Sequence, residues 1–192
     1  MLHFSKYKNL ILIIIYILLD QIIKLLINVY WIDNYYDINS KMAFKPMLNK
    51  DYSYVNSTFG IDISLQIHII LIILVLLILI IIYKYISANN LNLKVLAQGL
   101  SLLIAGCICS LLDKILWSGS LDYICLKGLL ILDLKDIYLM IAEIILIIWI
   151  IIEHELVTRL KIRDIIKHLK ESIINTRSTI LHDYVLKNKI KK

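Results

Sequence analysis

Apolar residues gather in four long stretches of the chain, at about residues 9–30, 65–86, 93–117 and 137–152. A helix needs ~20 mostly apolar residues to cross a bilayer, and each stretch comes close to that length. The second stretch contains an unbroken apolar run from Ile69 to Ile82. The pattern predicts four transmembrane helices, and hence an all-α integral membrane protein.

The positions of Lys and Arg predict how these helices are oriented. Lysines precede the first stretch and flank the turn between the second and third, and ten more Lys and Arg follow the fourth. Loops rich in Lys and Arg stay on the cytoplasmic side. We therefore expect both termini in the cytoplasm, and an extracytoplasmic loop region made of residues 31–64 and 118–136.

The chain is expected to divide into a membrane domain, residues 1–152, and a basic tail, residues 153–192. The tail holds ten Lys and Arg against five Asp and Glu, and its apolar residues recur at helical spacing over 156–174. This pattern favours an amphipathic helix lying on anionic membrane lipid. A solvated tail with some helicity is the alternative.

Composition narrows the class of protein further. Hydrophobic residues make up 60% of the chain and charged residues 19%, whereas soluble domains have roughly 45–50% and about 25%. This excludes a soluble single-domain enzyme, a disordered tail protein and a disulfide scaffold. The net charge of +6 lies mostly in the tail, so it does not indicate nucleic-acid binding. The three cysteines lack metal-binding spacing, and we predict neither a metal nor a cofactor.

Several charged residues lie inside the predicted helices, where charge is costly and usually faces the bundle. Asp20 and Lys24 are spaced i, i+4, so they either neutralise each other or serve a function. On the third helix, Ser110 and Asp113 share one face, and Asp113 places a carboxyl group at the outer membrane surface. The neighbouring Lys114 is expected to reach that surface by snorkelling.

Further carboxylates follow near the start of the fourth stretch. Asp122 lies in the second outer loop, and Asp133 and Asp136 precede the helix. Glu143 lies seven residues after Asp136, and hence on the same face of the helix. Asp133 as a helix N-cap, with Asp136 in the first turn, is a simple structural explanation. Two carboxylates that share a proton can instead act as base and acid and hydrolyse an amide, as in aspartic proteases.

Short motifs along the chain resemble those of signal peptidase II, the lipoprotein signal peptidase of bacteria. Residues 20–24, Asp-Gln-Ile-Ile-Lys, resemble its D-x-x-x-K. Residues 105–114, Ala-Gly-Cys-Ile-Cys-Ser-Leu-Leu-Asp-Lys, resemble G-G-x-x-G-N-x-x-D-R. Residues 121–124, Leu-Asp-Tyr-Ile, resemble V-V-D-F-I, and residues 133–136, Asp-Leu-Lys-Asp, resemble N-x-A-D. The N-x-G-x-A-F motif is represented by residues 54–59, Tyr-Val-Asn-Ser-Thr-Phe.

The resemblance implies a four-helix peptidase of the bacterial cell membrane with its active site at the outer face. Asp122 and Asp136 would be the catalytic aspartates. The substrate would be a prolipoprotein whose cysteine carries diacylglycerol, cleaved before that cysteine. The residues that would orient the site or the substrate are Asp20, Lys24, Asn56, Phe59, Ser110 and Asp113.

The chain departs from the family pattern within these motifs. The departures include Ser110 for Asn, Lys114 for Arg, Asp133 for Asn and Lys135 for Ala, and the N-x-G-x-A-F motif survives only in part. These departures favour an alternative, a catalytically inactive paralogue that acts as a membrane scaffold. A small proton-coupled carrier is a further alternative, suggested by the acids inside the helices, although no paired repeats or broken helices are visible.

Overall fold

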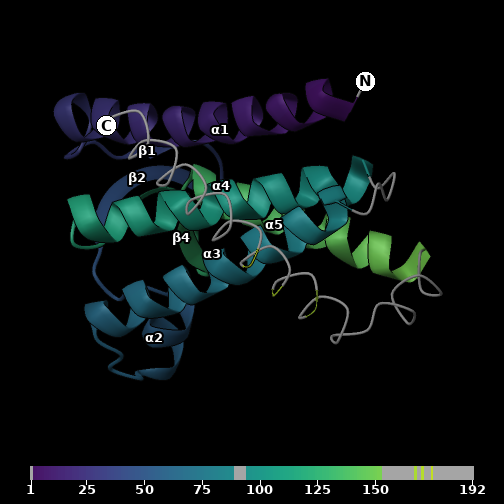
Figure 1. The fold of residues 1–192 in the computed structure, drawn as a ribbon. Coiled ribbons are helices and arrows are strands. Elements are labelled where there is room, and N and C mark those ends of the chain that lie inside the picture. The colour runs from purple at the N-terminus through teal and green to yellow at the C-terminus, as the bar shows by residue number, and fades with distance from the viewer. Residues whose placement is uncertain (1, 89–93, 153–166, 168–169, 171–173, 175–192) are drawn as a thin grey trace, which may run out of the picture.

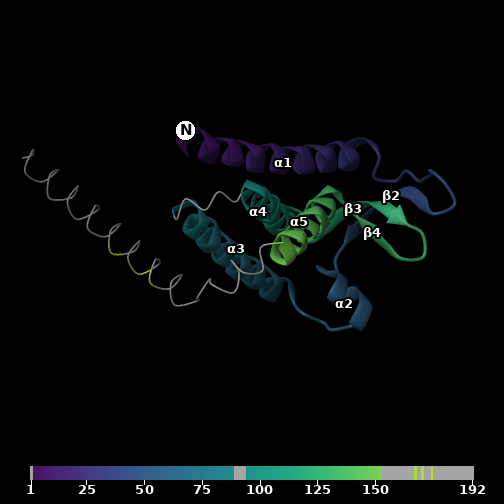
Figure 2. The same cartoon turned by 90° about the vertical axis from the view of Figure 1, so that its right-hand side faces the viewer.

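The computed structural model describes residues 2–88 and 94–152, together with residues 167, 170 and 174. Four long helices make up most of it: α1 (Leu2–Tyr30), α3 (Leu65–Ala88), α4 (Lys94–Leu116) and α5 (Leu134–Ile152). A small sheet and the short helix α2 (Tyr54–Phe59) lie together at one end of these helices (Figures 1 and 2). The predicted surface helix over 156–174 lies outside the described residues, apart from three positions.

Three of the helices are long and apolar enough to cross a membrane, over Tyr7–Tyr30, Leu65–Ile86 and Val95–Leu116. They confirm the first three predicted spans. Helix α5 is shorter, with 19 residues, and it carries Lys135, Asp136 and Glu143, so it is not among them. Its crossing of the membrane stays a prediction.

Helix α4 is the central helix, because it packs against α1, α3 and α5. The buried core between the helices includes Ile13 of α1, Leu79 of α3, Ile104 of α4 and Trp149 of α5. Gly106 lets α4 and α5 approach closely, since a Cβ at this position would lie 2.6 Å from a methyl group of Leu139. Large apolar side chains cover the outward faces of the helices, as expected for faces that meet lipid.

The two outer loops together form a four-stranded antiparallel sheet. Its strands are β1 (Tyr36–Asp37), β2 (Met42–Asn49), β3 (Ser120–Leu126) and β4 (Leu130–Leu132), in the order β1-β2-β3-β4. The all-α prediction is therefore wrong for these loops, although the described chain is mostly helical. The central pairing joins β2 to β3 across more than seventy residues of sequence. No local pattern predicts such a pairing, because the two strands lie in different loops and neither loop shows more than a partial alternation of apolar and polar residues.

A bulge in β2 sets which residues face each other across the sheet. Phe44 pairs with Ile124, but Met47 pairs with Asp122, so β2 has one extra residue between these pairs. Pro46, the only proline of the chain, lies within this interval, and proline cannot donate a hydrogen bond to a neighbouring strand. As a result Asn49 pairs with Ser120, at the end of the sheet that meets the helices.

Candidate active site

Carboxylates and lysines from four parts of the chain converge where the sheet meets the helices. They are Asp20 and Lys24 of α1, Asp113 and Lys114 of α4, Asp122 of β3, and Asp133, Lys135 and Asp136 at the start of α5. All are buried except Asp136, whose side chain is 28% exposed. We call these eight residues the charged cluster. Charges are rarely buried unless they are paired, so the pairing within the cluster decides its chemistry.

Lys24 forms three close ion pairs inside the cluster. Its Nζ lies 2.9 Å from Asp20 Oδ2, 2.6 Å from Asp113 Oδ2 and 2.7 Å from Asp133 Oδ2. An ammonium has three N–H donors, so all of them have an acceptor. Gln21 also donates to Asp20 and Asp113, at 3.0 Å each. The predicted neutralisation of Asp20 by Lys24 is thus part of a larger arrangement.

Asp133 and Asp136 cap the start of α5 reciprocally. The Asp136 backbone N–H donates to Asp133 Oδ1 at 3.1 Å, and the Asp133 N–H donates to Asp136 Oδ2 at 3.1 Å. This is a capping box with Asp in place of the usual Glu. The structural explanation of Asp133 as the N-cap is confirmed. The cap also holds the Asp136 side chain near the start of the helix, beside Asp122.

Lys135 reaches into the centre of the cluster. Its Nζ forms a short ion pair with Asp133 Oδ2, and lies 2.7 Å from Ser120 Oγ and 3.2 Å from Asp113 Oδ2. It is 3.7 Å from Asp136 Oδ1 and 3.9 Å from Asp122 Oδ1. The ammonium therefore lies between the two predicted catalytic aspartates, with its three nearest acceptors elsewhere.

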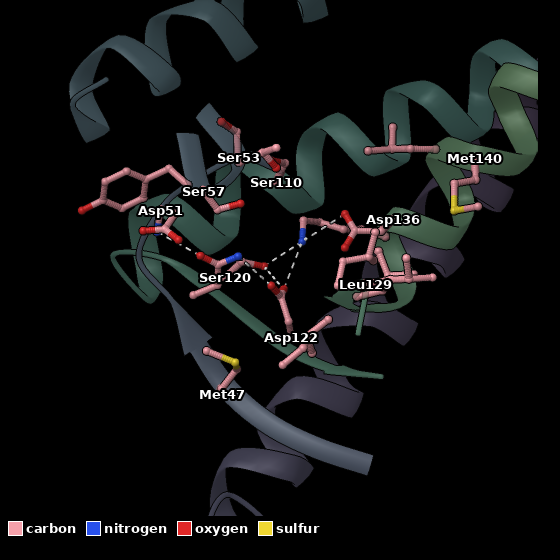
Figure 3. Close-up of a pocket in the computed structure, with 18 of the residues that line it drawn as sticks. Met47, Asp51, Ser53, Ser57, Ser110, Ser120, Asp122, Leu129, Asp136 and Met140 are labelled. Atoms are coloured by element: carbon pink, nitrogen blue, oxygen red, sulfur yellow. Dashed lines mark hydrogen bonds and ion pairs between the residues drawn. The ribbon is translucent and has the colours of Figure 1, made fainter. Parts of the chain in front are cut away.

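Asp122 and Asp136 lie at a cavity of about 720 Å³ (Figure 3). Asp122 Oδ2 accepts a hydrogen bond from Asn49 Nδ2 at 3.0 Å, and its Oδ1 accepts one from Ser120 Oγ at 2.8 Å. The lining also includes apolar side chains, among them Met47, Leu129, Leu139 and Met140, and further polar ones such as Ser53 and Thr58. A cavity that combines apolar walls with converging polar groups is typical of a binding site.

The three carboxylates Asp122, Asp133 and Asp136 have oxygen atoms within 4.8 Å of one another. Such a group could hold a cation, but the Lys135 ammonium already lies among them. The protein therefore supplies its own positive charge at this point. We assign no metal to the site.

The environment separates the acidities of these carboxyls. Burial raises the pKa of Asp122, and raises that of Asp136 to about 7, although Lys135 partly opposes both shifts. Burial acts in the same direction on Asp133, but Lys135 and Lys24 outweigh it and lower the pKa to about 2. Near neutral pH, Asp133 is therefore a fixed anion, while Asp136 exchanges a proton. A buried carboxyl that exchanges a proton near neutral pH, as Asp136 does, is suited to acid–base catalysis.

Ser110 and Lys114 line the cavity, one turn apart on α4. Lys114 Nζ donates to Ser110 Oγ at 3.2 Å, and the residue is only 4% exposed. The expectation that Lys114 snorkels to the membrane surface is therefore wrong. Asp113, also on α4, points into the charged cluster through its contact with Lys24.

Two of the predicted site residues, Asn56 and Phe59, lie neither in the charged cluster nor at the cavity. The side-chain amide of Asn56 bonds the backbone of Ile63, with its Nδ2 3.0 Å from the carbonyl oxygen and its Oδ1 3.3 Å from the nitrogen. It closes the loop that follows α2. Phe59 is 71% exposed. Helix α2 lines the cavity through Ser57 and Thr58 instead.

Asn49, which is not among the predicted site residues, is the asparagine that contacts Asp122, one of the two predicted catalytic aspartates. A signal was available, because residues 49–54, Asn-Lys-Asp-Tyr-Ser-Tyr, have an Asn, a small residue and an aromatic at the spacing of N-x-G-x-A-F. Ser for Ala and Tyr for Phe are modest changes. The glycine of the motif is replaced by Asp51, which hides this match from a reading of the sequence alone.

Comparison with solved structures finds the same fold in bacterial membrane enzymes. Two structures, both described as a bacterial membrane enzyme, match with a TM-score of 0.63 and 19% sequence identity. They cover 74% and 81% of this chain, and 92% and 94% of their own chains. Comparison with curated proteins finds no match. The sequence model described as Signal peptidase (SPase) II matches residues 12–152, well over half of the chain, and the protein therefore belongs to the signal peptidase II family.

Proposed function

We propose that this protein is an active membrane endopeptidase that cleaves the signal peptide of prolipoproteins before a lipid-modified cysteine. The signal peptidase II family consists of aspartic-type peptidases that process lipoprotein signal peptides. We assign Asp122 and Asp136 as the catalytic pair. In this proposal residues 137–152 of α5 form the fourth transmembrane span, and the sheet and α2 cover the site at the outer face of the membrane.

The observation that carries this assignment is the distribution of charge within the cluster. It contains five carboxylates and three lysines, so two carboxylates are in excess. Asp20, Asp113 and Asp133 each lie within 2.9 Å of Lys24. Among the described residues, the nearest ammonium is 3.7 Å from Asp136 and 3.9 Å from Asp122. The two carboxylates left without a close counter-ion are those at the cavity.

The proposed chemistry uses these two carboxylates with opposite protonation. Asp122 accepts hydrogen bonds from Asn49 and Ser120, which favour its charged form, so it takes a proton from the attacking water. Asp136, whose raised pKa lets it hold a proton near neutral pH, gives that proton to the leaving nitrogen as the C–N bond breaks. The water oxygen bonds to the carbonyl carbon and becomes part of the new carboxyl group. The proton taken by Asp122 then passes to Asp136, which restores the pair.

The remaining predicted residues divide into two roles under this proposal. Asp20, Lys24 and Asp113 hold the charged cluster together, and so position the pair rather than touch the substrate. Ser110 and Lys114 line the cavity and would contact the substrate's peptide. The lipid-bearing substrate would enter sideways from the bilayer, because the apolar side of the cavity includes residues of α5.

A non-catalytic scaffold on the same fold is the second candidate function. The observation that favours it is the Lys135 ammonium, which lies between the two aspartates where the resemblance implies an alanine. A fixed cation at this point can hold both carboxylates ionised and so remove the acid of the pair.

The experiment that separates these functions is rescue of lipoprotein maturation in bacteria depleted of their own signal peptidase II. We expect this chain to convert diacylglyceryl-modified precursor to the mature form. The same chain with Asp122→Asn should insert at the same level and leave the precursor uncleaved. If the wild-type chain inserts at a normal level and no precursor matures, the peptidase proposal fails and the scaffold function replaces it.

The proposed orientation predicts which positions react with a thiol reagent that cannot cross the membrane. Leu129 lies at the turn between β3 and β4 and is 78% exposed. In a chain lacking the native cysteines, Leu129→Cys should react in intact cells. A cysteine at position 90, between α3 and α4, is the matched control and should react only after the membrane is opened. The reverse pattern would contradict the orientation. Cys125, also predicted outside, is only partly buried and should behave like Leu129→Cys.

A further inference from the structure

Lys135 is unusual because its ammonium lies among the acids of the candidate site without making its closest contacts to the catalytic pair. Its three nearest acceptors are Asp133 Oδ2, Ser120 Oγ and Asp113 Oδ2. An ammonium has only three N–H donors. None is therefore left to bind a substrate carbonyl, and a direct catalytic contact by Lys135 is disfavoured.

The ammonium nevertheless acts on the pair through space. It lies 3.7 Å from Asp136 and 3.9 Å from Asp122, and the side chain is only 6% exposed. Water screens such a buried charge weakly. An opposite charge at this distance lowers the pH at which a carboxyl takes up a proton by about one to three units. The cation is also anchored, because its own contacts hold it in place.

We propose that Lys135 is a positioning residue of the catalytic pair, whose buried, anchored ammonium keeps Asp122 and Asp136 from holding two protons and so sets the acid end of the working pH range. The inference rests on the proposed function for its effect on cleavage. Under this inference Lys135, which departs from the family pattern, sets the pH range of the pair and does not inactivate it. The pair is shifted to work at lower pH, and Asp136 still keeps its proton near neutral pH.

Apart from Asp133, the other charges that face the pair do not change in the variants proposed below. Asp20, Lys24 and Asp113 belong to the ion pairs of α1 and α4, and Lys114 comes from α4. Asp51, after β2, and Glu143, on α5, lie at the cavity wall. Asp133 and Asp113 are the further charges in direct contact with Lys135, and Asp133 makes the shorter contact. Asp133 also raises the pKa of both members of the pair. It therefore serves as an opposite-sign probe.

The test measures cleavage of a diacylglyceryl-modified lipoprotein precursor by the purified full-length protein between about pH 4.5 and 9. Removing the cation with Lys135→Met raises the pKa values of the pair, so the whole pH–rate profile should move to higher pH by about one to three units. Lys135→Arg keeps the charge and should keep the profile close to that of wild type. Asp133→Asn removes an anion and should move the profile to lower pH.

A double variant separates an electrostatic role from a merely structural one. Lys135→Ala with Asp133→Asn removes one positive and one negative charge and restores the N-x-A-D pattern. Its profile should return close to that of wild type, although two buried groups have been changed. Profiles of Lys135→Met and Asp133→Asn that both match wild type, with all proteins folded, would overturn the inference. Where Lys135→Met fails to accumulate, Asp133→Asn and the double variant still decide it.

A second readout does not depend on cleavage. Infrared difference spectra report the C=O stretch of protonated carboxyls, which disappears as each acid ionises. In Lys135→Met this band should persist to a pH about one to three units higher than in wild type, and Asp136→Asn in that background should reduce it. An unshifted band refutes the role of Lys135. A shifted band in a wild-type chain that cleaves nothing refutes the proposed function and leaves the role of Lys135 standing.

Discussion

Cleavage of the lipoprotein precursor should fall below detection when either Asp122 or Asp136 is replaced by Asn. Each substitution nearly preserves the shape of the side chain but removes its ability to exchange a proton. General acid–base catalysis is typically worth 10²–10⁴-fold in rate, and loss of the activated water adds to that. The double variant should be no worse than either single one, because two groups that act as a unit are not additive. A precursor-cleavage assay on equal amounts of folded protein measures all three.

Two further substitutions serve as controls for this result. Asp37→Asn changes an exposed aspartate of β1 that pairs with Lys127, and it should leave cleavage unaltered. Asp133→Asn keeps a capping oxygen, so we expect it to cleave, with the displaced pH profile described above. An active Asp136→Asn beside an inactive but well-folded Asp133→Asn would contradict the assignment. The second catalytic role would then belong to Asp133.

The largest loss of stability is expected from Lys24→Met. Lys24 is fully buried and is the close counter-ion of Asp20, Asp113 and Asp133. Removing one partner of a buried ion pair typically costs about 3–5 kcal/mol, because it leaves an uncompensated buried charge. Here one substitution affects three carboxylates at once. We expect a clear drop in the unfolding temperature of the detergent-solubilised protein, followed by tryptophan fluorescence, and reduced accumulation in cells.

The matched control is Lys127→Met, which breaks an ion pair with Asp37 at the exposed edge of the sheet. It should leave the unfolding temperature unchanged, because exposed pairs contribute little. Adding Asp113→Asn to Lys24→Met should recover part of the lost stability by removing one of the unpaired carboxylates. Equal unfolding temperatures for Lys24→Met and Lys127→Met would show that the buried ion pairs do not hold the cluster together.

Features that depend on neighbouring residues could be read from the sequence. The first three spans follow from the length of their apolar runs, because a helix crosses the bilayer when enough consecutive residues are apolar. The two residues of the capping box, Asp133 and Asp136, are three apart in the sequence, and Asp20 and Lys24 are four apart. Helix geometry brings such residues together whatever the rest of the chain does. The order of the motifs was sufficient to indicate the family.

The contacts that give the site its chemistry join segments far apart in the chain. Asn49 reaches Asp122 only because β2 pairs with β3 beyond the bulge at Pro46. No sequence pattern predicted that sheet, and the predicted site residue was therefore Asn56, whose amide is used in its own loop. Likewise Lys114 was expected at the membrane surface, but the cavity beside α5 encloses it.

The sequence by itself therefore determined the first three apolar helices, the local cap of α5 and the residue types found at the candidate site. Tertiary structure alone decided how the five carboxylates share three lysines, and hence which two remain without a close counter-ion. The physical reason is that the interaction between charges depends on distances of a few ångströms in a medium that screens weakly. Packing of α1, α4, β3 and the start of α5 sets those distances, and it also places the ammonium of Lys135 between Asp122 and Asp136.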